Sequence, residues 1–142
     1  MEPRFLIDTS VWSEALRRKK NSKSLSTTIL SGLILNEYDI ILVGMILQEI
    51  LSGITDKKLF NEISHTLSDF PFIEATKKNY IYAAELRNLL KTKGITAGSF
   101  DFLIASIAIQ NNLTLVTLDK DFKHIAKHTD LKLLDLDKTF PY

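Results

Sequence analysis

Short apolar runs that alternate with helical patterns constrain this chain more than any other feature. Arg4–Ile7, Ile40–Val43 and Thr114–Thr117 have the length and apolar content of strands that are buried on both faces. The longer segments between them carry apolar residues that recur every three to four positions, as in amphipathic helices. Strands that alternate with helices indicate a parallel sheet with helices on both faces. The sequence therefore predicts a three-layer α/β/α fold with a central parallel sheet.

Capping residues set the expected starts of several helices. Asp8-Thr9-Ser10 is expected to cap a first helix that starts near Val11, and Asp56 a helix that runs to about residue 67. Ser99 and Asp121 are expected to cap two later helices, at about 100–110 and 122–127. The remaining helices are expected at about 24–37, 45–51 and 76–93, with further short strands at 72–73 and 131–134.

Size and composition are those of one globular domain with a substantial core. The chain has 142 residues, of which 45% are hydrophobic and 25% charged, so we expect a single domain over residues 1–142. No run of eighteen uncharged apolar residues occurs, and the first eight residues are too short and carry charge too early for a secretory signal. We therefore expect a soluble, cytoplasmic protein that does not enter a membrane.

The types of metal site open to this chain are limited by its lack of cysteine. Without cysteines, a metal can be held only by oxygen ligands or by the three histidines. His124 and His128 have the four-residue spacing that can chelate one ion, but they lack a glutamate-flanked zinc motif. A solvated helix surface explains this pair better than a metal site does.

Acidic residues follow the predicted strands at the positions where open parallel sheets bind ligands. Asp8 ends the first strand, Glu49 lies in the helix after the second, and Asp119 follows the Thr114–Thr117 strand. Asp101 begins the apolar helix that leads into that last strand. Ligands sit outside the carboxyl ends of parallel strands, near the point where strand order reverses. We expect the four acids to gather at this end of the sheet.

Each acid also has an ordinary explanation. Asp8 can cap a helix, Glu49 can be a solvated helical residue, and Asp119 can belong to a turn. Asp101 is the only charged residue between Lys93 and Asp119, and its ordinary explanation is stabilisation by the helix dipole. That stabilisation is about 0.3–1 kcal/mol, which is small beside the several kcal/mol that burying an unpaired ion costs. If the helix is as buried as its composition suggests, Asp101 needs a cation.

Four carboxylates in one pocket repel one another and favour a bound metal. Their like charges raise one another's pKa until a positive charge intervenes. Ligands that are all oxygen favour Mg²⁺ or Mn²⁺ over zinc or copper, and Mg²⁺ also binds substrate phosphates. A net charge of +1 provides no global attraction to a polyanion, so phosphate contacts must be local. The candidate contacts form a basic run near the end of the first helix: Arg17, Arg18, Lys19, Lys20 and Lys23.

Four segments together resemble the PIN-domain nucleases, and most of all the VapC-type toxins of bacterial and archaeal toxin–antitoxin pairs. They lie around Asp8, Glu49, Asp101 and Asp119, in the sequences FLIDTSVW, LQEILSG, FDFLIA and LVTLDKDF, and the similarity spans nearly the whole chain. The family pattern favours Asp119 over Asp121 as the ligand residue. Phe102 is bulkier than the small residue often found after the third acid.

This resemblance implies an activity, a cofactor and partners. It implies that the four acids bind one or two Mg²⁺ or Mn²⁺ ions, with Asp8, Asp101 and Asp119 as the metal ligands. Thr9 or Ser10 and Thr117 would supply supporting hydroxyls, and Asp121 a helix cap or a supporting carboxylate. It further implies that an activated water cleaves RNA to leave a 5′-phosphate and a 3′-hydroxyl, with Arg17, Arg18, Lys19 and Lys20 as RNA contacts, and that the protein forms a homodimer silenced by an antitoxin.

Three other functions remain open at this stage. A PIN-fold nuclease of RNA processing would have the same site without acting as a toxin. A phosphate-accepting receiver domain would need adjacent acids after the first strand, where this chain has Asp8 followed by Thr9. A non-catalytic RNA-binding or dimerisation module would bind no metal.

Overall fold

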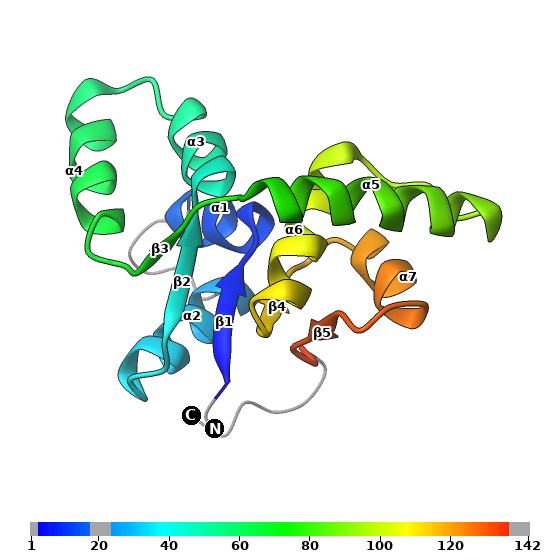
Figure 1. Cartoon of the computed structure of the whole chain (residues 1–142). Coiled ribbons are helices and arrows are strands. Elements are labelled where there is room, and N and C mark those ends of the chain that lie inside the picture. Colours follow the sequence, from blue (N-terminus) through cyan, green and yellow to red (C-terminus); the bar gives the residue numbers. More distant parts are fainter. Residues whose placement is uncertain (1–2, 18–23, 137–142) are drawn as a thin grey trace.

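The computed structural model describes residues 3–17 and 24–136 (Figure 1). Within these ranges, seven helices surround a five-stranded sheet. The strands are β1 (Arg4–Ile7), β2 (Ile40–Val43), β3 (Phe72–Ile73), β4 (Leu113–Val116) and β5 (Lys132–Leu133). The helices are α1 (Thr9–Arg17), α2 (Leu25–Leu35), α3 (Gly44–Ser52), α4 (Lys57–Leu67), α5 (Lys77–Thr92), α6 (Ser99–Gln110) and α7 (Asp121–Lys127).

The sheet is parallel throughout and has the order β3-β2-β1-β4-β5. From β1 the chain adds strands on one side as far as β3, and then crosses to the other side of β1 to form β4. Strand order therefore reverses between β1 and β4, where Ile7 lies opposite Val116. This pair of strands marks the position where open α/β sheets bind ligands.

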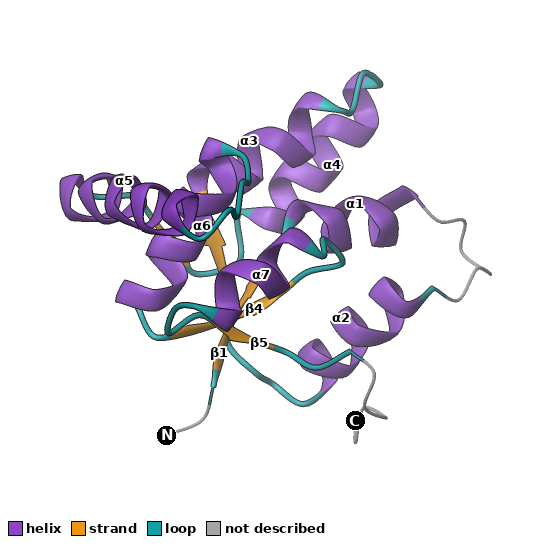
Figure 2. Cartoon of the chain, turned by 90° about the vertical axis from the view of Figure 1, so that its right-hand side faces the viewer, coloured by secondary structure: helices purple, strands orange, loops and turns teal. Residues whose placement is uncertain are grey.

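Helices cover both faces of the sheet, which confirms the expected three layers. Figure 2 shows α1 and α2 on one side of the strands and α5 and α6 on the other, with α3 and α4 as a hairpin that projects beyond the sheet. Because successive strand residues point to opposite faces, a strand covered on both faces must be apolar along its whole length. All four residues of β2 are accordingly buried.

One helix starts earlier than expected, and two of the expected caps are wrong. Helix α1 begins at Thr9, because the Asp8 carbonyl accepts the N–H groups of Val11 and Trp12, so Thr9 and Ser10 lie in its first turn. Ser99 is the first helical residue of α6 and follows the cap position, which Gly98 occupies. Asp121 likewise lies inside α7, and its N–H donates to the Asp119 carboxylate at 2.9 Å.

The other predicted elements lie close to their expected positions. Ser24, Asp56 and Thr76 cap α2, α4 and α5 through their side chains. The last strand is shorter than predicted, since only Lys132–Leu133 pair with β4. No helix within residues 3–17 and 24–136 is long and apolar enough to cross a membrane.

Candidate metal centre

Asp8 occupies the carboxyl end of β1, beside the segment that follows β4. Its N–H donates to the Val116 carbonyl at 2.9 Å, which extends the pairing of the two strands by one residue. The residue is 7% exposed, and the hydroxyls of Ser10 and Thr117 donate to its Oδ2 at 2.9 and 2.7 Å. These two hydroxyls fix the orientation of the carboxylate, and among the described residues no hydrogen bond is made to its Oδ1.

The same two hydroxyls also hold the backbone that carries Asp119. Ser10 Oγ accepts the Leu118 N–H at 3.1 Å, and Thr117 Oγ1 accepts the Asp119 N–H at 3.0 Å. Each hydroxyl has a single proton, which it gives to Asp8, so the 3.5 Å approach between Ser10 Oγ and Thr117 Oγ1 has no proton left to share. The network therefore couples the position of Asp8 to that of Asp119.

Three carboxylates converge next to this network. One oxygen each from Asp101, Asp119 and Asp121 lies within 4.8 Å of the other two. Asp101 comes from the first turn of α6, Asp119 follows β4, and Asp121 begins α7. Asp121 is the most exposed of the three. The structure thus places Asp121, predicted only as a supporting residue, in the same group as Asp101 and Asp119.

Electrostatics link Asp8 to this group through Asp101. Burial raises the pKa of Asp101, and the charges of Asp119, Asp8 and Asp121 raise it further. A hydrogen bond from the Gly98 N–H to Asp101 Oδ2, at 3.2 Å, lowers this pKa and partly offsets the rise. Asp101 therefore combines the helix-capping role with membership of a crowded acidic cluster, and a cation at this position would relieve the repulsion.

Glu49 lies at the margin of the centre. It is an exposed residue of α3, and the Thr9 hydroxyl donates to its Oε2 at 3.1 Å. Thr9 directly follows Asp8, so this hydrogen bond draws α3 towards the end of β1. Glu49 is not a member of the group formed by Asp101, Asp119 and Asp121.

The predicted basic contacts fall largely outside the described residues. Arg17 is the last residue of α1, while Arg18, Lys19, Lys20 and Lys23 lie outside the described ranges. The structure offers other cations near the acids. A cavity of about 490 Å³ is lined by Asp119, Lys120 and Lys123, among others. Sequence reasoning overlooked Lys120 and Lys123 because it treated the segment after β4 only as a source of acids.

Histidine ligands do not contribute to the acidic centre. The group of three potential ligands found among the described residues contains only carboxylates. His124 lies in the last turn of α7 and His128 is its C-cap, and both are exposed. The geometry thus gives no support to the alternative of a histidine metal site.

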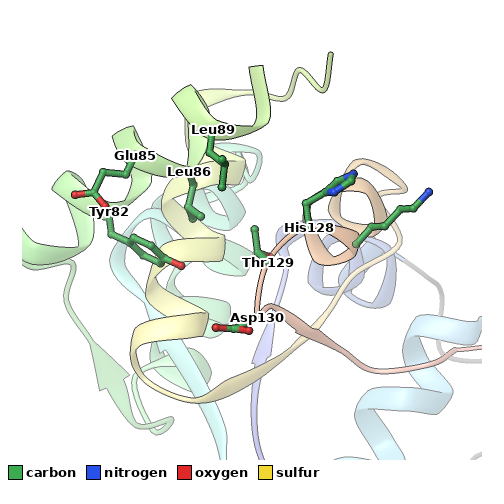
Figure 3. Close-up of a pocket in the computed structure, with 8 residues that line it drawn as sticks. Tyr82, Glu85, Leu86, Leu89, His128, Thr129 and Asp130 are labelled. Atoms are coloured by element: carbon green, nitrogen blue, oxygen red, sulfur yellow. The ribbon is translucent and has the colours of Figure 1, made fainter. Parts of the chain in front are cut away.

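A second cavity, of about 590 Å³, lies away from the acids (Figure 3). Residues of α5, including Tyr82 and Leu86, form one side, and residues 128–130 form the other. Burial raises the pKa of Tyr82, and the charges of Asp130 and Glu85 add to the effect. None of the three clustered carboxylates lines this cavity.

The donor set of the centre fits a hard divalent cation. All the converging side chains offer oxygen, the ligand atom that Mg²⁺, Mn²⁺ and Ca²⁺ prefer. The group stands at the point of strand-order reversal and combines crowded carboxylates with a fixed hydroxyl network. Fold and site together define an α/β protein with a candidate carboxylate metal centre.

Comparison with known proteins identifies the family. The PIN domain model matches residues 5–128. Ribonuclease VapC2 from Rickettsia felis is 30% identical over 126 residues, which cover 85% of this chain and 91% of that protein. Ribonuclease VapC11 from Mycobacterium tuberculosis is 30% identical over 131 residues, covering 90% and 96% of the two chains.

A solved structure agrees with these relatives. The crystal structure of VapBC2 from Rickettsia felis, bound to a DNA fragment from its promoter, contains a chain that superposes with a TM-score of 0.72 at 28% identity. The match covers 92% of this chain and 96% of that one. This chain therefore belongs to the PIN-domain family, and its relatives within that family are VapC-type ribonucleases. PIN nucleases use divalent metal ions, and the acidic centre is compatible with one.

Proposed function

We propose that this chain is a metal-dependent endoribonuclease and the toxin of a toxin–antitoxin pair, folded as one PIN domain over residues 1–142. The observation that carries this proposal is the convergence of Asp101, Asp119 and Asp121 beside Asp8 at the strand-order reversal. The ribonuclease relatives reported above support the reaction, and the hydroxyl network around Asp8 supports a preorganised site.

Asp8, Asp101 and Asp119 are the residues that would hold the ion, which we propose to be Mg²⁺ or Mn²⁺. When bound, such an ion supplies Lewis-acid stabilisation of phosphate charge and lowers the pKa of a coordinated water. Asp8 presents its Oδ1, since its Oδ2 is engaged by Ser10 and Thr117. Asp121 stands at the exposed side of the same group and supports it.

Glu49 is the candidate general base. The Thr9 hydroxyl engages Oε2, and no hydrogen bond to Oε1 is present among the described residues, so Oε1 can accept a proton from the attacking water. That water would attack the phosphorus and break its bond to the leaving 3′-oxygen, which takes up a proton from solvent, so the products are a 5′-phosphate and a 3′-hydroxyl. Thr9 positions the carboxylate through its hydroxyl proton and takes no part in the proton transfer.

Substrate and partners follow from the same proposal. Single-stranded or looped RNA is the substrate, and Arg17, Arg18, Lys19 and Lys20 are proposed to contact its phosphates. We propose an antitoxin partner and a homodimer, and a cytoplasmic location because the substrate is RNA. The structure of VapBC2 from Rickettsia felis, a related complex bound to promoter DNA, supports a partnered toxin.

A cleavage assay tests the proposal. Purified protein is incubated with end-labelled single-stranded RNA in EDTA, in Mg²⁺ and in Mn²⁺, and the new ends are identified by their susceptibility to a 5′-phosphate-dependent exonuclease. We expect internal cleavage that requires the ion and leaves 5′-phosphates. Cleavage that persists in EDTA, or the absence of cleavage with both ions across a panel of transfer, ribosomal and messenger RNAs, would contradict the proposal.

A further inference from the structure

A cavity of about 490 Å³ lies between the start of α3, the start of α5 and one side of α6. Its apolar lining includes Val43 at the end of β2 together with Leu103 and Ile107 of α6. A volume of this size falls within the range of small-ligand sites, which are about 300–1,000 Å³. The cavity is large enough for one nucleotide.

Two exposed aromatic rings line this cavity. Phe100 is 60% exposed and Tyr80 is 57% exposed. Large apolar side chains of this kind contribute most to folding when they are buried, so two exposed rings beside one hollow point to an intermolecular role. Their ring faces can stack on any nucleic-acid base.

The polar groups of the cavity suit a neutral ligand that carries N–H donors. Glu74 and Gln48 line it, and their side chains have no hydrogen-bond partner within residues 3–17 and 24–136. No lysine or arginine is among its described lining residues. A phosphate here would meet the carboxylate of Glu74 without a cation, whereas a base could donate its amino or imino protons to that carboxylate.

The cavity shares two helical segments with the acidic centre. Phe100 directly precedes Asp101 in α6, and Gln48 directly precedes Glu49 in α3. Consecutive helical residues point in directions about 100° apart, so a single turn can serve two adjoining sites. A base in the cavity would therefore belong to a nucleotide near the acids.

We propose that this cavity binds one unpaired base of the RNA, next to the phosphodiester bond that is cut, by stacking on Phe100 and Tyr80. Glu74 and Gln48 contact the edge of that base and set which base is preferred. The proposal rests on the proposed ribonuclease function and adds a substrate requirement, namely a base that is not paired. A second copy of this chain is the competing occupant, and it would need a surface of about 800 Å² on each partner, which extends well beyond this hollow. The dimer measurement below distinguishes the two.

Fluorescence of a base analogue tests the stacking directly. Single-stranded RNA octamers carry 2-aminopurine at one position each, and binding is measured in EDTA, which prevents metal-dependent cleavage. For the wild type we expect quenching at one position or two neighbouring positions. Phe100→Leu and Tyr80→Leu should each weaken binding about tenfold and abolish that quenching, because base stacking on an aromatic side chain contributes at this level. Phe100→Trp should retain both signals.

The matched control is Phe60→Leu, which makes the same replacement at a 37% exposed phenylalanine of α4 that does not line the cavity. It should leave binding and quenching unchanged. Glu74→Gln should alter the ranking of octamers that differ only at the quenched base. Duplex RNA should show no quenching.

Three results would overturn the inference: no quenching by the wild type at any position, unchanged quenching in Phe100→Leu, or an effect of Phe60→Leu equal to that of Phe100→Leu. Light scattering adds a fourth, since a Phe100→Leu protein that loses a dimer but keeps its RNA quenching would assign the cavity to a protein interface. Failure of the proposed function would look different, because base quenching would persist while Mg²⁺ produced no cleavage.

Discussion

Replacing Asp101 with asparagine separates the two roles that the structure gives this side chain. Its Oδ2 accepts the Gly98 N–H at 3.2 Å, and the asparagine carbonyl can accept the same bond. Its charge lies among the carboxylates of Asp119 and Asp121, within 4.8 Å. The substitution therefore keeps the helix cap and removes both the repulsion and a charge that would bind metal.

The expected change in stability is the relief of repulsion minus the lost helix-dipole stabilisation. Two unit charges 4.8 Å apart repel by roughly 3.5 kcal/mol at an effective dielectric constant of 20, and by roughly 0.9 kcal/mol in water. Because Asp101 is only partly buried, we expect a relief of about 1–2 kcal/mol, less about 0.3–1 kcal/mol of lost helix-dipole stabilisation. The metal-free variant should therefore melt about 3 °C higher than the wild type.

The stability gained by the Asp101→Asn variant over the wild type should increase with pH. Since the pKa of Asp101 is raised, the folded protein keeps this proton at pH values where the unfolded chain has lost it. The free energy of unfolding of the wild type therefore falls as pH rises from the ordinary carboxyl pKa through the raised value. The advantage of the variant should be absent at acid pH and complete above the raised pKa.

Thermal melting in EDTA and across a Mn²⁺ titration measures both effects. Wild-type protein should gain roughly 2.7 kcal/mol at a hundred times the dissociation constant, and Asp101→Asn should gain clearly less. Asp56→Asn is the matched control, since Asp56 caps α4 by accepting the Leu59 N–H at 2.9 Å and lies outside the acidic group. An Asp101→Asn protein that melts lower than wild type in EDTA, yet shows the full Mn²⁺ shift, would refute this reasoning.

Further predictions concern the hydroxyl network, pH and the basic run. Thr117→Val should weaken Mn²⁺ binding about 10- to 100-fold by calorimetry, whereas Thr117→Ser keeps the hydroxyl and should bind normally. Cleavage at limiting Mg²⁺ should increase as pH rises through the raised pKa of Asp101, because the ion competes with the proton; a flat profile would exclude this carboxyl as a ligand. RNA binding should depend less steeply on salt when the four basic residues are neutralised, namely Arg17, Arg18, Lys19 and Lys20. An unchanged slope would mean that these residues contact no phosphates.

The layer order of the fold could be predicted from the sequence because its signals are local. An apolar run such as Ile40–Val43 is fully buried only when helices cover both faces of the sheet. A capping residue such as Asp56 marks the start of its helix in the sequence itself. The caps at Ser99 and Asp121 were predicted wrongly because a neighbour competed for the same backbone groups. Asp101 reaches back to Gly98, and Asp119 accepts the N–H of Asp121.

The sequence singled out most of the acidic residues that the structure brings together, but only part of their arrangement. Position after a strand was enough to select Asp8 and Asp119, because parallel strands end at a common edge. The approach of Asp121 to Asp101 depends on how α7 turns relative to α6, which no local pattern encodes. The aromatic cavity also arises from three helices distant in sequence, so neither Tyr80 nor Phe100 could be singled out beforehand.

Single-turnover RNA cleavage by Asp8→Asn and Asp119→Asn at saturating Mn²⁺ tests the central claim most directly. Asp69→Asn makes the same change at an exposed residue outside the acidic group and serves as the control. We expect the two site variants to remain folded and to cleave at least about a hundredfold more slowly than wild type, because each loses a ligand to the ion that supports catalysis. Cleavage by Asp119→Asn at the rate of Asp69→Asn would show that the carboxylate centre is not where the reaction occurs.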